Sequence, residues 1–186
     1  MIIARVIFDD TITSAAVREA LHDRGVYIAA FPPADGRQPA TSVIGTALSE
    51  ELKAAGVVVA TTETLVMSGI DFVRERLPDD QHPTVDEIEG QLRPYLDSIL
   101  DPDGAVTEDD LNSPLGPLRA SASRVFDADV LVTTDVALLK MGRIGKLVAI
   151  DPVKWLDQAD SIVRQHRRSG DGPGRGNDQP GTAPRH

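Results

Sequence analysis

The chain lacks cysteine, has few aromatic residues and contains no long apolar run. With no Cys among 186 residues, disulfide frameworks, Cys-ligated zinc, iron–sulfur clusters and thiol catalysis are excluded. Aromatic residues make up only 4 % of the chain, so we expect an aliphatic core. No apolar stretch approaches the ~20 residues that span a bilayer, and the N-terminus has no secretory pattern. We therefore expect a cytoplasmic protein with no membrane contact.

Positive charge is also scarce. The chain carries 19 Lys and Arg against 29 Asp and Glu, a net charge of −10. A broad nucleic-acid-binding surface needs clustered Lys and Arg to neutralise phosphates, so this composition argues against one. An acidic site that holds a divalent cation, and meets a phosphate through that cation, remains open.

The body of the chain alternates between strand and helix patterns. Short apolar runs predict strands at Ile2–Phe8, Val26–Phe31, Val57–Ala60, Val130–Thr133 and Leu147–Ile150. Apolar spacing and cap residues predict helices at Ser14–Arg24, Val43–Ala55, Glu63–Leu77, Thr84–Leu100 with a kink or break at Pro94, Pro117–Phe126, Ala137–Met141 and Pro152–His166. Strands separated by helices favour an α/β fold, a three-layer α/β/α domain with a mainly parallel central sheet.

The end of the chain has a different composition. From Arg164 to His186 it is rich in Gly, Pro and Arg and shows no apolar periodicity. We therefore predict one α/β domain over 1–163 and a disordered tail over 164–186. The segment Asp101–Pro114 is acidic and is expected to be a loop.

Two predicted strands end in carboxylates. The first runs into Asp9 and Asp10, and the Val130–Thr133 strand is followed by Asp135. Ligands of parallel α/β sheets bind beyond the carboxyl ends of the strands, so we expect Asp9 and Asp135 to converge there and bind Mg²⁺ or Mn²⁺. Strand alternation should turn Asp10 to the other face. The alternative is that these residues only form turns or cap helices.

Three segments resemble PIN domains. Val6–Ala15 looks like the family's opening, a strand that ends in Asp, followed by a small residue and then Asn, Ser or Thr. Ala128–Leu139 looks like its second hallmark, a strand closing on Thr-x-Asp. Gly145–Leu156 resembles the last strand and the following Pro-x-x-Trp-Leu helix. The resemblance covers both ends of 1–160 and little of the middle.

The resemblance implies a PIN-like, Mg²⁺- or Mn²⁺-dependent ribonuclease that hydrolyses single-stranded RNA. Many PIN domains are toxins of toxin–antitoxin pairs, so an antitoxin protein and a second copy of the chain are candidate partners. Asp9 and Asp135 match the first and last acids of the family's site. Thr11 and Thr133 match the polar residues that support them.

Two further acids of the family do not carry over. Met67 stands where a Glu is expected, and the third acid falls near Gly116 or Pro117. The candidate replacements are Glu63 and Asp71, one helical turn to either side of Met67, and Asp110, with its neighbour Asp109.

Two other functions compete with the nuclease. A PIN-like fold without these acids could be a non-catalytic binding or regulatory module. Asp9, Asp10 and Thr11 also resemble the Asp-x-Asp-x-Thr opening of haloacid-dehalogenase-like phosphatases, although the spacing is one residue short. That enzyme would trap a phosphate covalently on Asp9.

Overall fold

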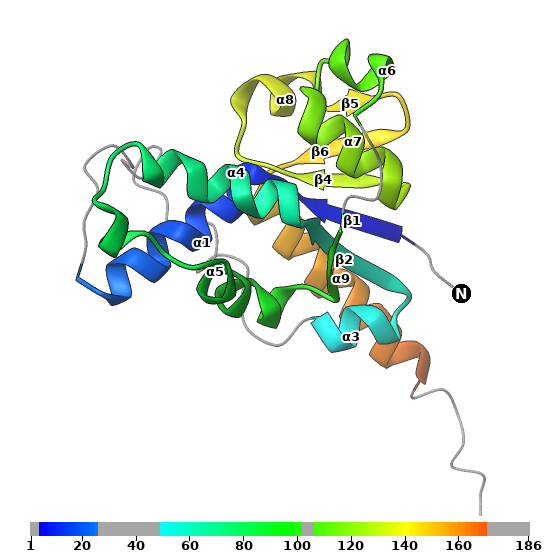
Figure 1. Cartoon of the computed structure of the whole chain (residues 1–186). Coiled ribbons are helices and arrows are strands. Elements are labelled where there is room, and N and C mark those ends of the chain that lie inside the picture. The colour runs from blue at the N-terminus through cyan, green and yellow to red at the C-terminus, as the bar shows by residue number, and fades with distance from the viewer. Residues whose placement is uncertain (1–3, 26–48, 102–105, 171–186) are drawn as a thin grey trace, which may run out of the picture.

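The computed structural model describes residues 4–25, 49–101 and 106–170 (Figure 1). The predicted strand Val26–Phe31, the first part of the predicted helix Val43–Ala55 and the end of the predicted tail, 171–186, lie outside these ranges.

The described residues form a six-stranded, mostly parallel sheet with the order β3-β2-β1-β4-β6-β5. The strands are β1 (Ala4–Phe8), β2 (Val57–Thr62), β3 (Ser98–Leu100), β4 (Val130–Val132), β5 (Arg143–Ile144) and β6 (Leu147–Ile150). Among the described strands, only the β5–β6 pairing is antiparallel. The predicted α/β class and mainly parallel sheet are confirmed.

Helices connect the strands. They are α1 (Asp10–Asp23), α3 (Ser49–Ala54), α4 (Glu63–Arg74), α5 (Val85–Leu92), α6 (Glu108–Leu111), α7 (Pro117–Phe126), α8 (Val136–Met141) and α9 (Pro152–Gly170), with single 3-10 turns η2 (Asp79–Gln81) and η3 (Arg93–Tyr95). The predicted α7 has the observed bounds, and the predicted strand Leu147–Ile150 is β6.

The helices pack on both faces of the sheet (Figure 1). Val6 and Phe8 of β1 belong to a buried cluster with α1, α5 and α9, and the alternate residue Ile7 belongs to a second cluster with α7 and α8. Successive side chains of a strand point to opposite faces, which is why one strand serves both clusters. Trp155 is buried in the first cluster and anchors α9, as its place in the sequence suggests.

The long helix predicted over Thr84–Leu100 is wrong in its second half. The capping box between Thr84 and Glu87 forms as expected, but α5 ends at Leu92. Pro94 lacks the N–H that would continue the helical hydrogen bonds, so the chain makes one 3-10 turn and then enters β3.

Two helix bounds differ from the sequence prediction by four residues. α1 begins at Asp10, four residues earlier than expected, and α9 continues to Gly170. The domain boundary at 163 is therefore too early. The extra turn of α9 is supported by an ion pair between Arg167 and Glu51, and by basic residues at the helix C-terminus.

The acidic segment Asp101–Pro114 is not entirely a loop. It contains the short helix α6, which Thr107 and Asp110 open through reciprocal capping bonds.

A close contact between α1 and α4 depends on Gly69. A Cβ at this position would lie 2.9 Å from Thr13 Oγ1 and 3.0 Å from the Ser14 backbone nitrogen. Gly69→Ala is therefore expected to lower the free energy of unfolding by roughly 1–3 kcal/mol, measured by urea denaturation. Gly90→Ala in α5 is the matched control. Its Cβ would meet nothing within 4 Å, so it should raise stability by about 0.4–1 kcal/mol. Equal effects of the two changes would contradict this packing.

Within the described ranges, no helix has the length and apolar character required to cross a bilayer.

Candidate functional site

The site lies where β1 and β4 end side by side. Phe8 pairs with Val132 in parallel register, and the backbone N–H of Asp9 donates to the Val132 carbonyl at 3.2 Å. β2 and β3 extend the sheet on one side of β1, and β4, which comes later in the chain, lies on the other side of β1. This reversal is the topological switch point, beyond which α/β folds bind ligands.

Asp9 is completely buried at the end of β1 and caps the first turn of α1. Its Oδ1 accepts the N–H of Thr11 at 2.9 Å, the Thr11 hydroxyl at 2.5 Å and the N–H of Ile12 at 3.4 Å. Its Oδ2 is also buried and accepts no hydrogen bond. One oxygen therefore holds the helix, and the other faces the site.

Asp135 divides its two oxygens in the same way at the end of the β4 segment. Oδ1 accepts the N–H groups of Ala137 and Leu138 at 2.8 and 3.3 Å and so caps α8. Oδ2 points toward the site, where Arg119 Nη1 donates to it at 3.0 Å. The helix-cap interpretation of these two acids accounts for one oxygen of each, and the other oxygen is left for the site interpretation.

Two threonines connect the strand ends. The Thr11 hydroxyl donates to Asp9 and accepts the N–H of Thr134 at 2.8 Å. The buried Thr133 hydroxyl accepts the N–H of Asp135 at 2.9 Å. The structure thus places Thr11 and Thr133 beside the two acids, in the supporting positions expected of them.

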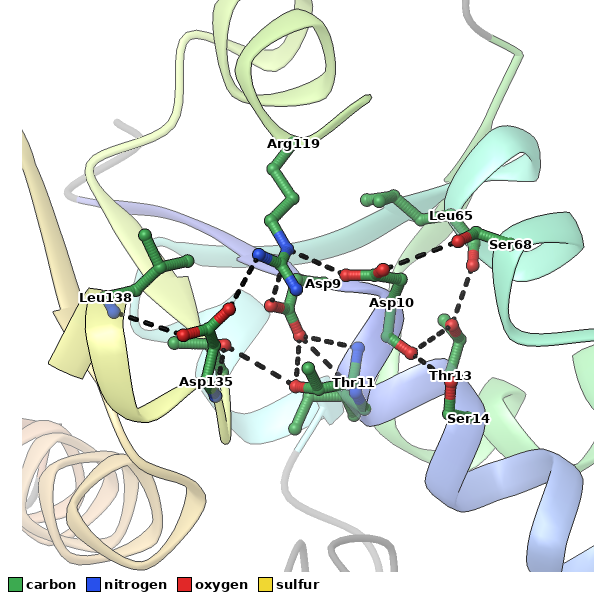
Figure 2. Close-up of polar contacts among 12 residues, drawn as sticks. Asp9, Asp10, Thr11, Thr13, Ser14, Leu65, Ser68, Arg119, Asp135 and Leu138 are labelled. Carbon is green, nitrogen blue, oxygen red and sulfur yellow. Dashed lines mark hydrogen bonds and ion pairs between the residues drawn. The ribbon is translucent and has the colours of Figure 1, made fainter. Parts of the chain in front are cut away.

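The expectation that Asp10 faces away from the site is wrong. Alternation fails because the strand ends at Phe8 and Asp10 is the first residue of α1. Its Oδ1 accepts from Arg119 Nε at 2.7 Å, and its Oδ2 lies 3.4 Å from the Ser68 hydroxyl (Figure 2). Asp10 is therefore a third carboxylate at this point, beside Asp9 and Asp135.

Arg119 of α7 lies among the three carboxylates (Figure 2). Its Nε is 3.1 Å from Asp9 Oδ2 and 2.7 Å from Asp10 Oδ1, while Nη1 is 3.0 Å from Asp135 Oδ2. The single Nε proton is donated to Asp10, which leaves Asp9 Oδ2 paired by charge alone. We call Asp9, Asp10, Asp135 and Arg119 the acid–arginine cluster.

Burial and charge act in opposite directions on the ionisation of this cluster. Burial raises the pKa of Asp9 to about 6, against the lowering effects of the Thr11 hydroxyl and the Arg119 charge. The pKa of Asp135 is lowered: burial raises it, but the backbone N–H groups of Leu138 and Ala137 and the Arg119 charge together lower it by more. Asp9 is thus the carboxylate that titrates closest to neutrality among these two.

The three candidate replacement acids have their contacts elsewhere. Glu63 is exposed at the start of α4 and lines a pocket of about 300 Å³ whose lining includes none of the cluster residues. Asp71 pairs with Arg74 on the surface of α4. Asp110 is buried, pairs with Arg124 at 2.8 Å and has its pKa lowered to about 2, first by the hydrogen bond from Arg124. The contacts of these residues do not connect them to the cluster.

The two positions where family acids were expected also have structural roles. Met67 is half-buried against the core on α4. Gly116 precedes α7 with φ 79° and ψ 156°, a conformation that is essentially restricted to glycine. An acidic side chain at Gly116 would therefore strain the start of α7.

Arg119 was not predicted from the sequence, because acidic residues were expected at its part of the site. A signal was present, because Arg119 lies one helical turn after Gly116 in a correctly predicted helix. A basic residue near the expected position of an acid is a candidate ion-pair partner for Asp9 and Asp135.

Comparison with known proteins adds no assignment to this geometry. No family model matches the chain, and no curated protein or solved structure matches it.

Proposed function

We propose that the chain is a PIN-like, Mg²⁺- or Mn²⁺-dependent ribonuclease that cleaves single-stranded RNA at the acid–arginine cluster. The observation that carries this proposal is the division of oxygens at Asp9 and Asp135. Each residue caps a helix with Oδ1 and directs Oδ2 to one point beyond the adjoining ends of β1 and β4.

The cluster supplies the type of ligand that a hard divalent cation takes, although among the described residues no group of three or more acids or histidines is already arranged to hold a metal ion. All three carboxylates of the cluster supply oxygen ligands, the kind that Mg²⁺ and Mn²⁺ prefer. Asp9 Oδ2 is buried without a hydrogen bond, an arrangement that is costly unless another positive group compensates it. Asp9 and Asp135 would hold the cation, and Asp10 is placed to join them.

The protein's own groups would fix the geometry of the reaction. Thr11 and the N-terminal turns of α1 and α8 hold Asp9 and Asp135 in single orientations, so little reorganisation is needed when a phosphate arrives. When bound, the cation would activate water and neutralise charge that develops on the phosphate. The Arg119 guanidinium is a group suited to phosphate oxygens.

The substrate class and the partners follow from charge and resemblance. With a net charge of −10, the chain offers little general attraction for RNA, so recognition would depend on the site. A single strand can place one phosphate there more easily than a duplex. The resemblance to PIN toxins favours an antitoxin protein as a partner.

A second candidate is a PIN-like binding module without catalysis. Arg119 favours it, because a guanidinium that pairs with all three carboxylates can hold them together without a metal. Met67, at the expected Glu position, also favours it. The two candidates differ in one property, specific affinity for a divalent cation.

Calorimetric titration with Mn²⁺ tests the proposal. The wild type is expected to bind Mn²⁺ specifically, and an Asp9→Asn/Asp135→Asn double variant is expected to lose this binding, because both site oxygens lose their charge. Asn can still cap α1 and α8, so the fold should persist and circular dichroism should confirm it. A folded wild type that binds no Mn²⁺ at millimolar concentration would favour the binding module.

A further inference from the structure

We propose that Arg119 is an internal counterion that competes with the divalent cation for the three carboxylates and so sets the metal affinity of the site. This inference rests on the proposed function and deepens it. It concerns a residue that neither the PIN resemblance nor the sequence pattern assigns to the site.

The geometry places the guanidinium where a shared cation would bind. Three carboxylate oxygens, one from each Asp, lie within 3.1 Å of its nitrogens. Two of these oxygens, on Asp9 and Asp135, are the ones left over after the helix caps are made. A metal ion that binds the same oxygens cannot occupy this point while the guanidinium is there.

Charge balance gives the competition its direction. Three ionised carboxylates around one guanidinium leave an excess negative charge, which a divalent cation compensates better than a monovalent one. The fit of Arg119 is also incomplete, because Asp9 Oδ2 accepts no hydrogen bond from it. A buried oxygen with an unused lone pair is a ligand position that the arginine does not satisfy.

The Arg119 side chain is not fully buried. Arg119 is in the first turn of α7, and its side chain is 17 % exposed. Among the described residues, the hydrogen-bond and ion-pair partners of its side chain are all members of the cluster. Rotation of a long side chain does not disturb the α7 backbone. Displacement of Arg119 by a metal therefore requires a rotamer change and leaves the sheet intact.

The experiment measures Mn²⁺ affinity without RNA, from the electron paramagnetic resonance signal of free Mn²⁺. Arg119→Gln removes the competing charge and keeps hydrogen-bonding capacity, and we expect its Kd for Mn²⁺ to fall at least 10-fold below that of the wild type. Arg119→Lys keeps the positive charge that competes with the cation, so its Kd should stay within about 3-fold of the wild type. Arg124→Gln, on the same helix but paired with Asp110, controls for the loss of one positive charge. It should bind Mn²⁺ like the wild type.

Each outcome has a defined meaning. A Gln variant that folds only when Mn²⁺ is present would support the inference, because the metal then replaces the missing cation. Equal or weaker binding by Arg119→Gln, with the wild type binding Mn²⁺, would overturn the inference and leave the proposed function standing. A tighter Kd in Arg124→Gln as well would show a general charge effect and would also overturn it. The absence of Mn²⁺ binding in every variant would overturn the proposed function, and the inference with it.

Discussion

Asp135→Asn is expected to lower the rate of RNA cleavage by about 100-fold or more, the scale of losing one preorganised charge at a reacting centre. The change removes the negative charge of Oδ2, the oxygen that faces the cluster. It retains an oxygen that can cap α8, and Asn is as good an N-cap as Asp. The loss should therefore be seen in kcat with the melting temperature nearly unchanged.

The matched control is Asp129→Asn at the opposite end of the same strand segment. Asp129 is exposed, and its Oδ2 accepts the backbone N–H of Arg5 at 2.9 Å, an interaction that an Asn oxygen can also make. This variant should cleave RNA at the wild-type rate. If Asp135→Asn also keeps the wild-type rate, Asp135 does not have the role assigned to it here.

The stability of the metal-free protein is expected to depend on pH through Asp9. Its pKa is about 6 in the folded state, raised mainly by burial, and its ordinary value is 3.8. Between these values the folded state binds more protons than the unfolded state, so stability falls as pH rises from about 4 to about 6. The shift corresponds to about 3 kcal/mol. Asp9→Asn removes this dependence. The free energy of unfolding of the variant, relative to that of the wild type, should therefore rise by about 3 kcal/mol between pH 4 and pH 7.

Asp110→Asn provides a control of opposite sign. The pKa of Asp110 is lowered to about 2, so this carboxylate stabilises the fold above its ordinary pKa and loses that effect as pH falls toward 2. Asp110→Asn should therefore be less stable than the wild type at pH 7, by a difference that shrinks toward pH 2. Urea denaturation in EDTA across the pH range measures both variants. A pH-independent difference between Asp9→Asn and the wild type would refute the buried, proton-binding role of Asp9.

The parts of the fold with strong local signals were predictable. The proline at its start and its apolar spacing predicted α7 with the observed bounds. An aliphatic run between turns predicted β6. The strand β3 was not predictable in this way, because three residues are too few to show a period. Pro94 marked a break in the helix, but local sequence does not say whether a helix or a strand follows.

Only part of the candidate site was predictable from the sequence. Convergence of Asp9 and Asp135 followed from parallel strands ending at one edge, and both carboxylates contact the same guanidinium. The direction of Asp10 depended on β1 ending one residue before Asp9, which lies within the error of any boundary prediction. Arg119 reaches the cluster from another helix, a tertiary contact that no local pattern specifies.

Cleavage of an end-labelled single-stranded RNA by the purified wild type tests the central claim most directly. We expect cleavage with Mn²⁺, no cleavage after EDTA is added, and recovery when excess Mn²⁺ is restored. An intact RNA in saturating Mn²⁺, with a correctly folded protein, would contradict the claim that the acid–arginine cluster is a ribonuclease site.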